Sequence, residues 1–71
     1  SARGRADAVV KTTDYIYVFE FKVDGTPEEA LAQINSKQYA IPYQADHRKV
    51  VKVGVNFDSS TRTIGEWIIE N

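Results

Sequence analysis

The sequence has no cysteine and no methionine, and little proline, glycine or histidine among its 71 residues. Without cysteine, the chain can form neither disulfides nor thiolate metal sites, and a reducing compartment is permitted. No apolar run approaches the ~18 residues of a membrane span, and no signal peptide is visible. We therefore expect a cytoplasmic protein with no membrane partner.

The chain is also short and nearly neutral. Its formal net charge is −1 at pH 7, so nucleic-acid binding would require a local basic patch. The single histidine, His47, has no partner at ligand spacing in its polar loop, and we expect it to be solvated. No methionine starts the chain, which suggests a fragment of a longer protein.

The most informative stretch is residues 15–23, which has the β-branched and aromatic composition of a strand. Side chains alternate between the two faces of a strand. One face is aromatic and apolar throughout, whereas the other ends in Glu20 and Lys22. Buried strands rarely carry charges unless those charges pair or do chemistry. An ion pair or a solvated strand end is the alternative. For the aromatic row, we favour core packing over a base-stacking platform.

The remaining elements predict an α+β fold. We expect further strands at residues 5–11, 49–57 and 62–70, and a helix from Pro27 to about Gln38. Thr26 and Glu29 form a capping-box pattern at the start of this helix. A helix of this length suits a right-handed crossover between parallel strands. The result is a mixed four-stranded sheet in the order strand-strand-helix-strand-strand. Because residues 15–23 are apolar on both faces, another part of the full protein or a second copy would cover the remaining face.

The turn between the first two strands decides whether Asp7 joins the charged pair. A two-residue loop at Thr12 and Thr13 places Asp7 opposite Val18, on the same face as Glu20 and diagonal to it. A slip of one residue would turn Asp7 to the other face. With the first register, the two carboxylates are within joint reach of one ion.

The spacing Asp7-x12-Glu20-x-Lys22 suits a hard cation beside an ammonium group. Two carboxylates can hold Mg²⁺ or Mn²⁺, and such an ion can polarise a phosphoryl oxygen. A neighbouring lysine can orient or deprotonate the attacking water, or stabilise charge on the phosphate.

These residues give the chain a resemblance to a known superfamily. Gly-Arg-Ala-Asp at 4–7 and Phe-Glu-Phe-Lys at 19–22 resemble the PD-(D/E)XK nucleases, with Ala6 in place of the proline. More narrowly, the chain is similar to the bacterial branch found C-terminal to AAA-ATPase-like regions. Residues 30–34, Tyr39, residues 42–43 and residues 53–57 extend the resemblance over nearly the whole chain.

The resemblance implies a restriction-endonuclease-like core that lacks its first helix and first strand, so that residues 1–71 are one partial domain. It also implies metal ligation by Asp7, Glu20 and the Phe21 carbonyl, and catalytic roles for Lys22 and for Gln33 on the helix. The function implied is metal-dependent hydrolysis of nucleic acid, most often DNA. An inactive regulatory or interaction module attached to an ATPase-like domain is the alternative.

Overall fold

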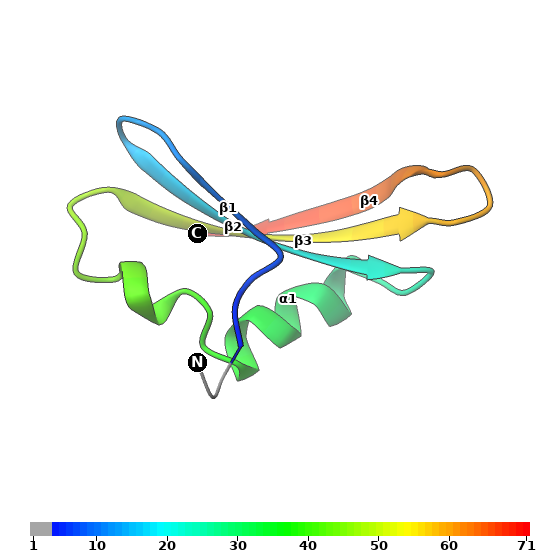
Figure 1. Cartoon of the computed structure of the whole chain (residues 1–71), viewed down its shortest axis with the longest axis horizontal. Helices are drawn as coiled ribbons and strands as arrows, with labels where there is room; N and C mark the ends of the chain where they lie inside the picture. Colours follow the sequence, from blue (N-terminus) through cyan, green and yellow to red (C-terminus); the bar gives the residue numbers. More distant parts are fainter. Residues whose placement is uncertain (1–3) are drawn as a thin grey trace.

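The computed structural model describes residues 4–71, as a sheet with a helix on one face (Figure 1). The strands pair in the order β1-β2-β3-β4, and only the β2–β3 pair is parallel. This confirms the predicted mixed sheet and element order. The elements are β1 (Ala8–Lys11), β2 (Tyr15–Val23), α1 (Pro27–Ser36), the 3-10 helix η1 (Ile41–Tyr43), β3 (Lys49–Asp58) and β4 (Thr63–Glu70).

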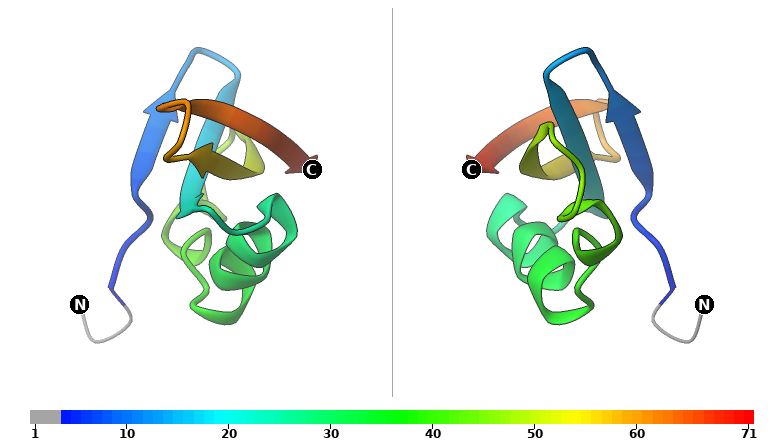
Figure 2. Two further views of the ribbon diagram at one scale, coloured as in Figure 1. Left: turned by 90° about the vertical axis from the view of Figure 1, so that its right-hand side faces the viewer. Right: turned by 90° about the vertical axis from the view of Figure 1, so that its left-hand side faces the viewer.

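Some predicted boundaries were wrong. Helix α1 ends at Ser36 rather than near Gln38, because Gln38 has a left-handed backbone with φ of 57°. Its start was predicted correctly, since the Thr26 side chain and the Glu29 side chain form the expected capping box. Strand β1 begins at Ala8 rather than at residue 5. Residues 4–7 leave the regular ladder and run toward the side of the sheet on which α1 and η1 lie (Figure 2).

The predicted hairpin register was wrong by two residues. Val10 pairs with Tyr17 rather than Tyr15. The turn lies one residue later than expected because Thr12 belongs to the ladder. Its N–H donates to the Tyr15 carbonyl at 2.8 Å, and its hydroxyl accepts from the Tyr15 N–H at 3.0 Å. A shift of two residues preserves the side-chain alternation, so Asp7 still approaches Glu20.

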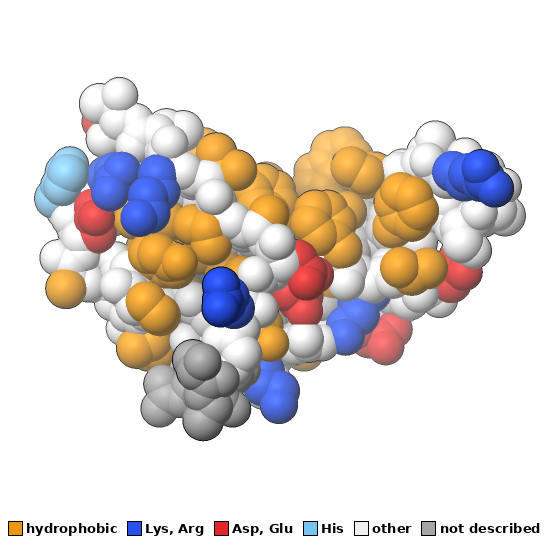
Figure 3. Space-filling model, in the orientation of Figure 1, with side chains coloured by type: hydrophobic (Ala, Val, Ile, Leu, Met, Phe, Trp, Pro, Cys, Tyr) orange, Lys and Arg blue, Asp and Glu red, His pale blue; other side chains and the backbone are white. Residues whose placement is uncertain are grey.

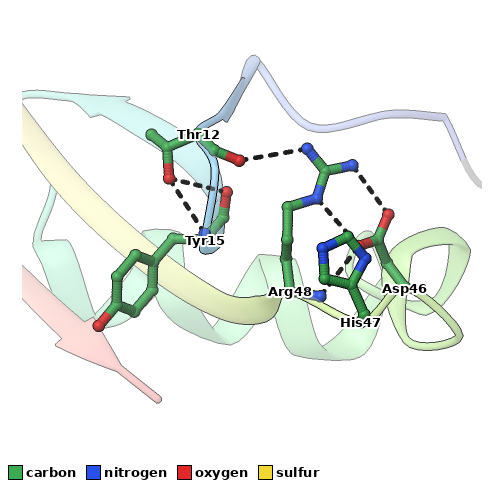
Figure 4. A network of polar contacts seen from close by, with 5 residues as sticks. All are labelled: Thr12, Tyr15, Asp46, His47 and Arg48. Atoms are coloured by element: carbon green, nitrogen blue, oxygen red, sulfur yellow. Dashed lines mark hydrogen bonds and ion pairs between the residues drawn. The ribbon is translucent and has the colours of Figure 1, made fainter.

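A second set of polar contacts ties this hairpin to the start of β3 (Figure 4). The Arg48 guanidinium forms two 2.9 Å hydrogen bonds with the Asp46 carboxylate and donates to the Thr12 carbonyl at 3.3 Å. The hydrogen bonds from Arg48 hold the pKa of Asp46 well below its usual range. The side chain of His47 is 83% exposed beside Asp46, which confirms the expectation that it is solvated.

The two faces of the sheet differ in what covers them. Helix α1 and the segment after it cover one face, where Ile16, Val18, Ile34 and Ala40 form the buried core. The other face carries the aromatic row of β2 beside Val51, Val53 and Val55, with no helix over it among the described residues (Figure 2). The row is therefore only half-buried. The outer members of the row, Tyr15 and Phe21, are exposed, as are Ile64, Trp67 and Ile69 of β4.

Gly54 allows α1 to approach the sheet closely. A Cβ atom at this position would lie 2.3 Å from the Pro27 carbonyl oxygen and 2.8 Å from the Leu31 nitrogen. Both are backbone atoms of α1, so no side-chain rotation could relieve the overlap. The missing side chain therefore sets the distance between helix and sheet.

We predict that Gly54→Ala destabilises the fold by about 1–3 kcal/mol, the usual cost of overpacking. Gly65→Ala is the matched control, because its Cβ would come closest to the movable end of the Asn56 side chain, at 2.8 Å, and the backbone oxygen of Asn56 would be 3.6 Å away. Urea unfolding of both variants measures the difference. Equal stability losses would contradict the importance of the close approach.

Candidate active site

The residues predicted to form a site come together at one end of the covered face. Glu20 and Lys22 project from β2 toward α1, Gln33 projects from α1 toward them, and Asp7 lies just before β1. Hydrogen bonds join Lys22 to Gln33, Gln33 to Glu20, and Glu20 to the backbone of Asp7. A glutamine on a helix surface carries no functional signal of its own. Gln33 nevertheless lies at the centre of this arrangement, because it forms hydrogen bonds with both Lys22 and Glu20.

The amide of Gln33 separates the ammonium group from the carboxylate. Its Oε1 accepts from Lys22 Nζ, and its Nε2 donates to Glu20 Oε2 at 2.6 Å. This orientation follows from the partners, because a lysine only donates and an ionised carboxylate only accepts. Lys22 and Glu20 are therefore not paired directly, and Lys22 is held by a neutral group.

Asp7 is anchored to the edge of β2 through its backbone and its carboxylate. Its N–H donates to the Phe19 carbonyl at 3.1 Å and to Glu20 Oε1 at 3.2 Å. Its Oδ2 accepts from the Phe21 N–H at 2.9 Å. Since Ala8 is also the ladder partner of Phe19, Asp7 and Ala8 both lie opposite one residue, as in a β-bulge. This irregularity directs the Asp7 carboxylate to the strand edge beside Glu20.

Glu20 is the buried charged residue of the described chain, with 4% exposure. Burial raises the pKa of Glu20 above its ordinary value, and the Asp7 carboxylate raises it further. The hydrogen bond from the Asp7 N–H and the charge of Lys22 lower the pKa, without cancelling these effects. The positive charge of Lys22 therefore compensates the two carboxylates only in part.

The donor atoms fit a hard divalent cation. Asp7 and Glu20 each use some of their lone pairs in hydrogen bonds and retain others, since a carboxylate can accept about four. The Phe21 N–H donates to the Asp7 carboxylate. Because the N–H and C=O of one strand residue point to the same side, the Phe21 carbonyl also faces Asp7. Within residues 4–71, no cluster of three or more His, Asp or Glu residues could hold a metal ion. Mg²⁺ requires fewer, because it usually binds one or two carboxylates and completes its shell with water and phosphate.

From the sequence, Tyr39 was identified only as part of the resemblance and had no predicted place in the site. Its hydroxyl lies 3.5 Å from Gln33 Nε2, so it borders the site from the segment after α1. No local pattern marks this role, because it depends on the turn that follows Ser36. The aromatic row, in contrast, lies on the sheet face opposite Glu20 and Lys22, away from these side chains.

The chain belongs to the PD-(D/E)XK nuclease superfamily, whose family model matches residues 1–67. It is 34% identical over 73 residues to an uncharacterized protein in the vnfD 5′ region of Azotobacter chroococcum mcd 1. That match covers 100% of this chain and 14% of the relative, so the chain spans about a seventh of the relative's length. No solved structure matches the chain. No helix within residues 4–71 is long and apolar enough to cross a membrane.

We predict that Glu20 makes the metal-free fold less stable as the pH rises. Its pKa is raised in the folded state above the ordinary value of 4.5, so the unfolded chain releases this proton first. The contribution of the protonated Glu20 carboxyl group to folding stability is therefore full below about pH 4.5. It is lost as the pH rises through the pKa of Glu20 in the folded protein. Urea unfolding of the wild type and of Glu20→Gln in EDTA measures the contribution of Glu20 to this pH dependence, because the variant lacks the titrating carboxyl group. A Glu20-dependent gain in stability over the same pH range would contradict the assignment.

Proposed function

We propose that this chain is the catalytic part of a divalent-metal-dependent nuclease that hydrolyses phosphodiester bonds, with DNA as the substrate. The observation that carries the proposal is the hydrogen-bonded arrangement of Lys22, Gln33, Glu20 and Asp7 at one end of the sheet. Membership of the nuclease superfamily supports the reaction class. An ionisable lysine beside two carboxylates, one of them buried, is the chemistry that such hydrolysis needs.

In this proposal, Asp7, Glu20 and the Phe21 carbonyl hold Mg²⁺ or Mn²⁺. When bound, the ion polarises a phosphoryl oxygen and lowers the pKa of water. Lys22 orients the attacking water or stabilises the charge that develops on the phosphate. Gln33 is a positioning residue, because it holds the Lys22 ammonium group at a fixed place beside Glu20. The full-length protein would act in the cytoplasm, with an ATPase-like region preceding this partial domain.

We predict that the full-length protein cleaves DNA in Mg²⁺ or Mn²⁺ and not in EDTA. Glu20→Gln and Lys22→Met should each lower the rate by about 10²–10⁴-fold, the usual contribution of acid-base groups. Release of a fluorophore from a labelled DNA substrate measures the rate.

Two exposed residues outside the site provide matched controls. Glu66→Gln in β4 and Lys49→Met at the start of β3 make the same chemical changes. Both should keep the wild-type rate. Cleavage that survives Glu20→Gln and Lys22→Met would contradict the proposed chemistry.

One observation favours a second candidate function, an interaction module without catalysis. The sheet face opposite α1 carries an apolar groove of about 490 Å³. Side chains from β2, β3 and β4 line it, namely Tyr17, Phe19, Phe21, Val53, Val55, Ile64, Trp67 and Ile69. An exposed apolar surface of this kind is typical of protein contacts. The ATPase-like region or a second copy would cover it.

Trp67 reports on this face, because it is the single tryptophan of the sequence and is 59% exposed. We predict that its fluorescence in the dilute 71-residue chain is that of a hydrated indole. Covering of the face would shift the emission to shorter wavelength. A shift that grows with protein concentration would indicate a second copy, and a shift only on addition of the upstream region would indicate that region. Unchanged emission in both experiments would exclude the face as an interface.

A further inference from the structure

A small pocket lies beside the candidate active site, between the N-terminal segment and the end of α1. It has a volume of about 200 Å³. The residues that line it come from the segment before β1, from β1, and from the stretch between α1 and η1, namely Gly4, Arg5, Ala6, Val9, Lys37, Gln38, Tyr39, Pro42 and Tyr43. Among these lining residues, Tyr39 is the one that connects the pocket to the hydrogen-bonded arrangement of Lys22, Gln33 and Glu20.

The charge of the pocket is opposite to that of the chain as a whole. Arg5 and Lys37 line it, and no aspartate or glutamate does, although acidic residues outnumber basic ones in the sequence. A third cation lies close by, because Lys11 Nζ stands 5.5 Å from the centre of the Tyr43 ring. In Figure 3, basic side chains lie on either side of the acidic side chains at the middle of the viewed face. Arg5, Lys37 and Lys11 thus place positive charge in and beside this pocket.

Tyr39 connects the pocket to the candidate active site. Its hydroxyl lies 3.5 Å from Gln33 Nε2, so one side of this tyrosine faces the site. The ring also lines the pocket, where Gly4 approaches it. A Cβ at Gly4 would lie 3.6 Å from the Tyr39 hydroxyl, and Gly4 has a left-handed φ of 76°. The chain then continues through Ala6, a lining residue, directly to Asp7. Pocket and site therefore share a wall.

We propose that this pocket binds a backbone phosphate of the nucleic-acid strand, next to the phosphodiester in the candidate active site. The inference rests on the proposed function and deepens it, because it assigns a place on the protein for the flanking part of the substrate. Arg5 and Lys37 contact the phosphate oxygens, and Tyr39 and Tyr43 supply the walls against which the neighbouring sugar and base lie.

The size of the pocket favours part of a polymer over a separate small molecule. Pockets for whole ligands measure ~300–1,000 Å³, and this one is smaller. Its two charged lining side chains suit a negatively charged phosphodiester group, and roughly half to two-thirds of protein–DNA hydrogen bonds go to phosphate oxygens and sugars. Such a contact fixes the position of the strand without reading its sequence.

The salt dependence of DNA binding tests the inference independently of cleavage. The full-length protein is titrated in EDTA with a short fluorescein-labelled DNA duplex between about 50 and 200 mM salt, and anisotropy gives the affinity. The double variant Arg5→Ala/Lys37→Ala should bind more weakly. The slope of log affinity against log salt should also fall in magnitude by about 0.9, the value for one phosphate contact. The double variant Arg62→Ala/Lys49→Ala, which removes the same charges elsewhere, should leave the slope unchanged.

In the cleavage assay, Arg5→Ala/Lys37→Ala should raise KM and leave kcat unchanged, because both residues bind substrate away from the reacting atoms. An unchanged slope, or an equal fall in the control, would overturn the pocket while the proposed function stands. A slope change in a protein that never cleaves DNA would support the pocket and contradict the proposed function. Rescue of the slope by Arg5→Lys/Lys37→Arg would identify charge, rather than packing, as the cause.

Discussion

The contact between α1 and the backbone of β3 at Gly54 is the constraint on which the site depends. No side chain separates the two elements there, so the Pro27 carbonyl and the Leu31 nitrogen lie directly over the strand. Gln33 follows Leu31 by two residues on the same short helix. Its amide can therefore reach Glu20 and Lys22 on the adjacent strand β2. With the helix held at a greater distance, the buried Glu20 carboxylate would lose its 2.6 Å hydrogen bond from Gln33. Leaving a buried polar group unsatisfied costs about 1–3 kcal/mol, and more for a charged group.

Burial of the Glu20 carboxylate is unfavourable for folding, and in the proposed function it would favour binding of a cation. The raised pKa shows that the folded protein disfavours the ionised carboxylate next to Asp7. Lys22 does not neutralise it directly, because Gln33 occupies the space between them. A divalent cation would supply the missing positive charge and reverse this preference. A buried charged group that lowers the stability of the fold in this way is typical of a functional site.

Much of the fold could be predicted from the sequence, because its signals are local. The strand composition of β2 and the capping box at Thr26 each rest on neighbouring residues. The hairpin register could not be predicted, since Thr12–Thr13 and Thr13–Asp14 have similar turn composition. A side-chain contact from Thr12 to the Tyr15 backbone decides between them.

For the site, the spacing of the charged residues indicated which side chains belong together. Their geometry depends on features that no pattern records. One is the irregular pairing of Asp7 opposite Phe19, and another is the turn after Ser36 that brings Tyr39 to Gln33. The open apolar face was partly foreseen, since a strand that is apolar on both sides needs two covering layers. The close approach of α1 to the sheet at Gly54 has no such local signal.

The central claim is that Asp7 and Glu20 hold one divalent cation, and isothermal titration calorimetry with Mn²⁺ tests it most directly. The account predicts one site per chain, lost in Asp7→Asn and in Glu20→Gln and retained in Glu66→Gln. Because Glu20 must be ionised to bind, affinity should rise with pH through its raised pKa. Binding that is absent in the wild type, or unchanged when both carboxylates are removed, would contradict the account.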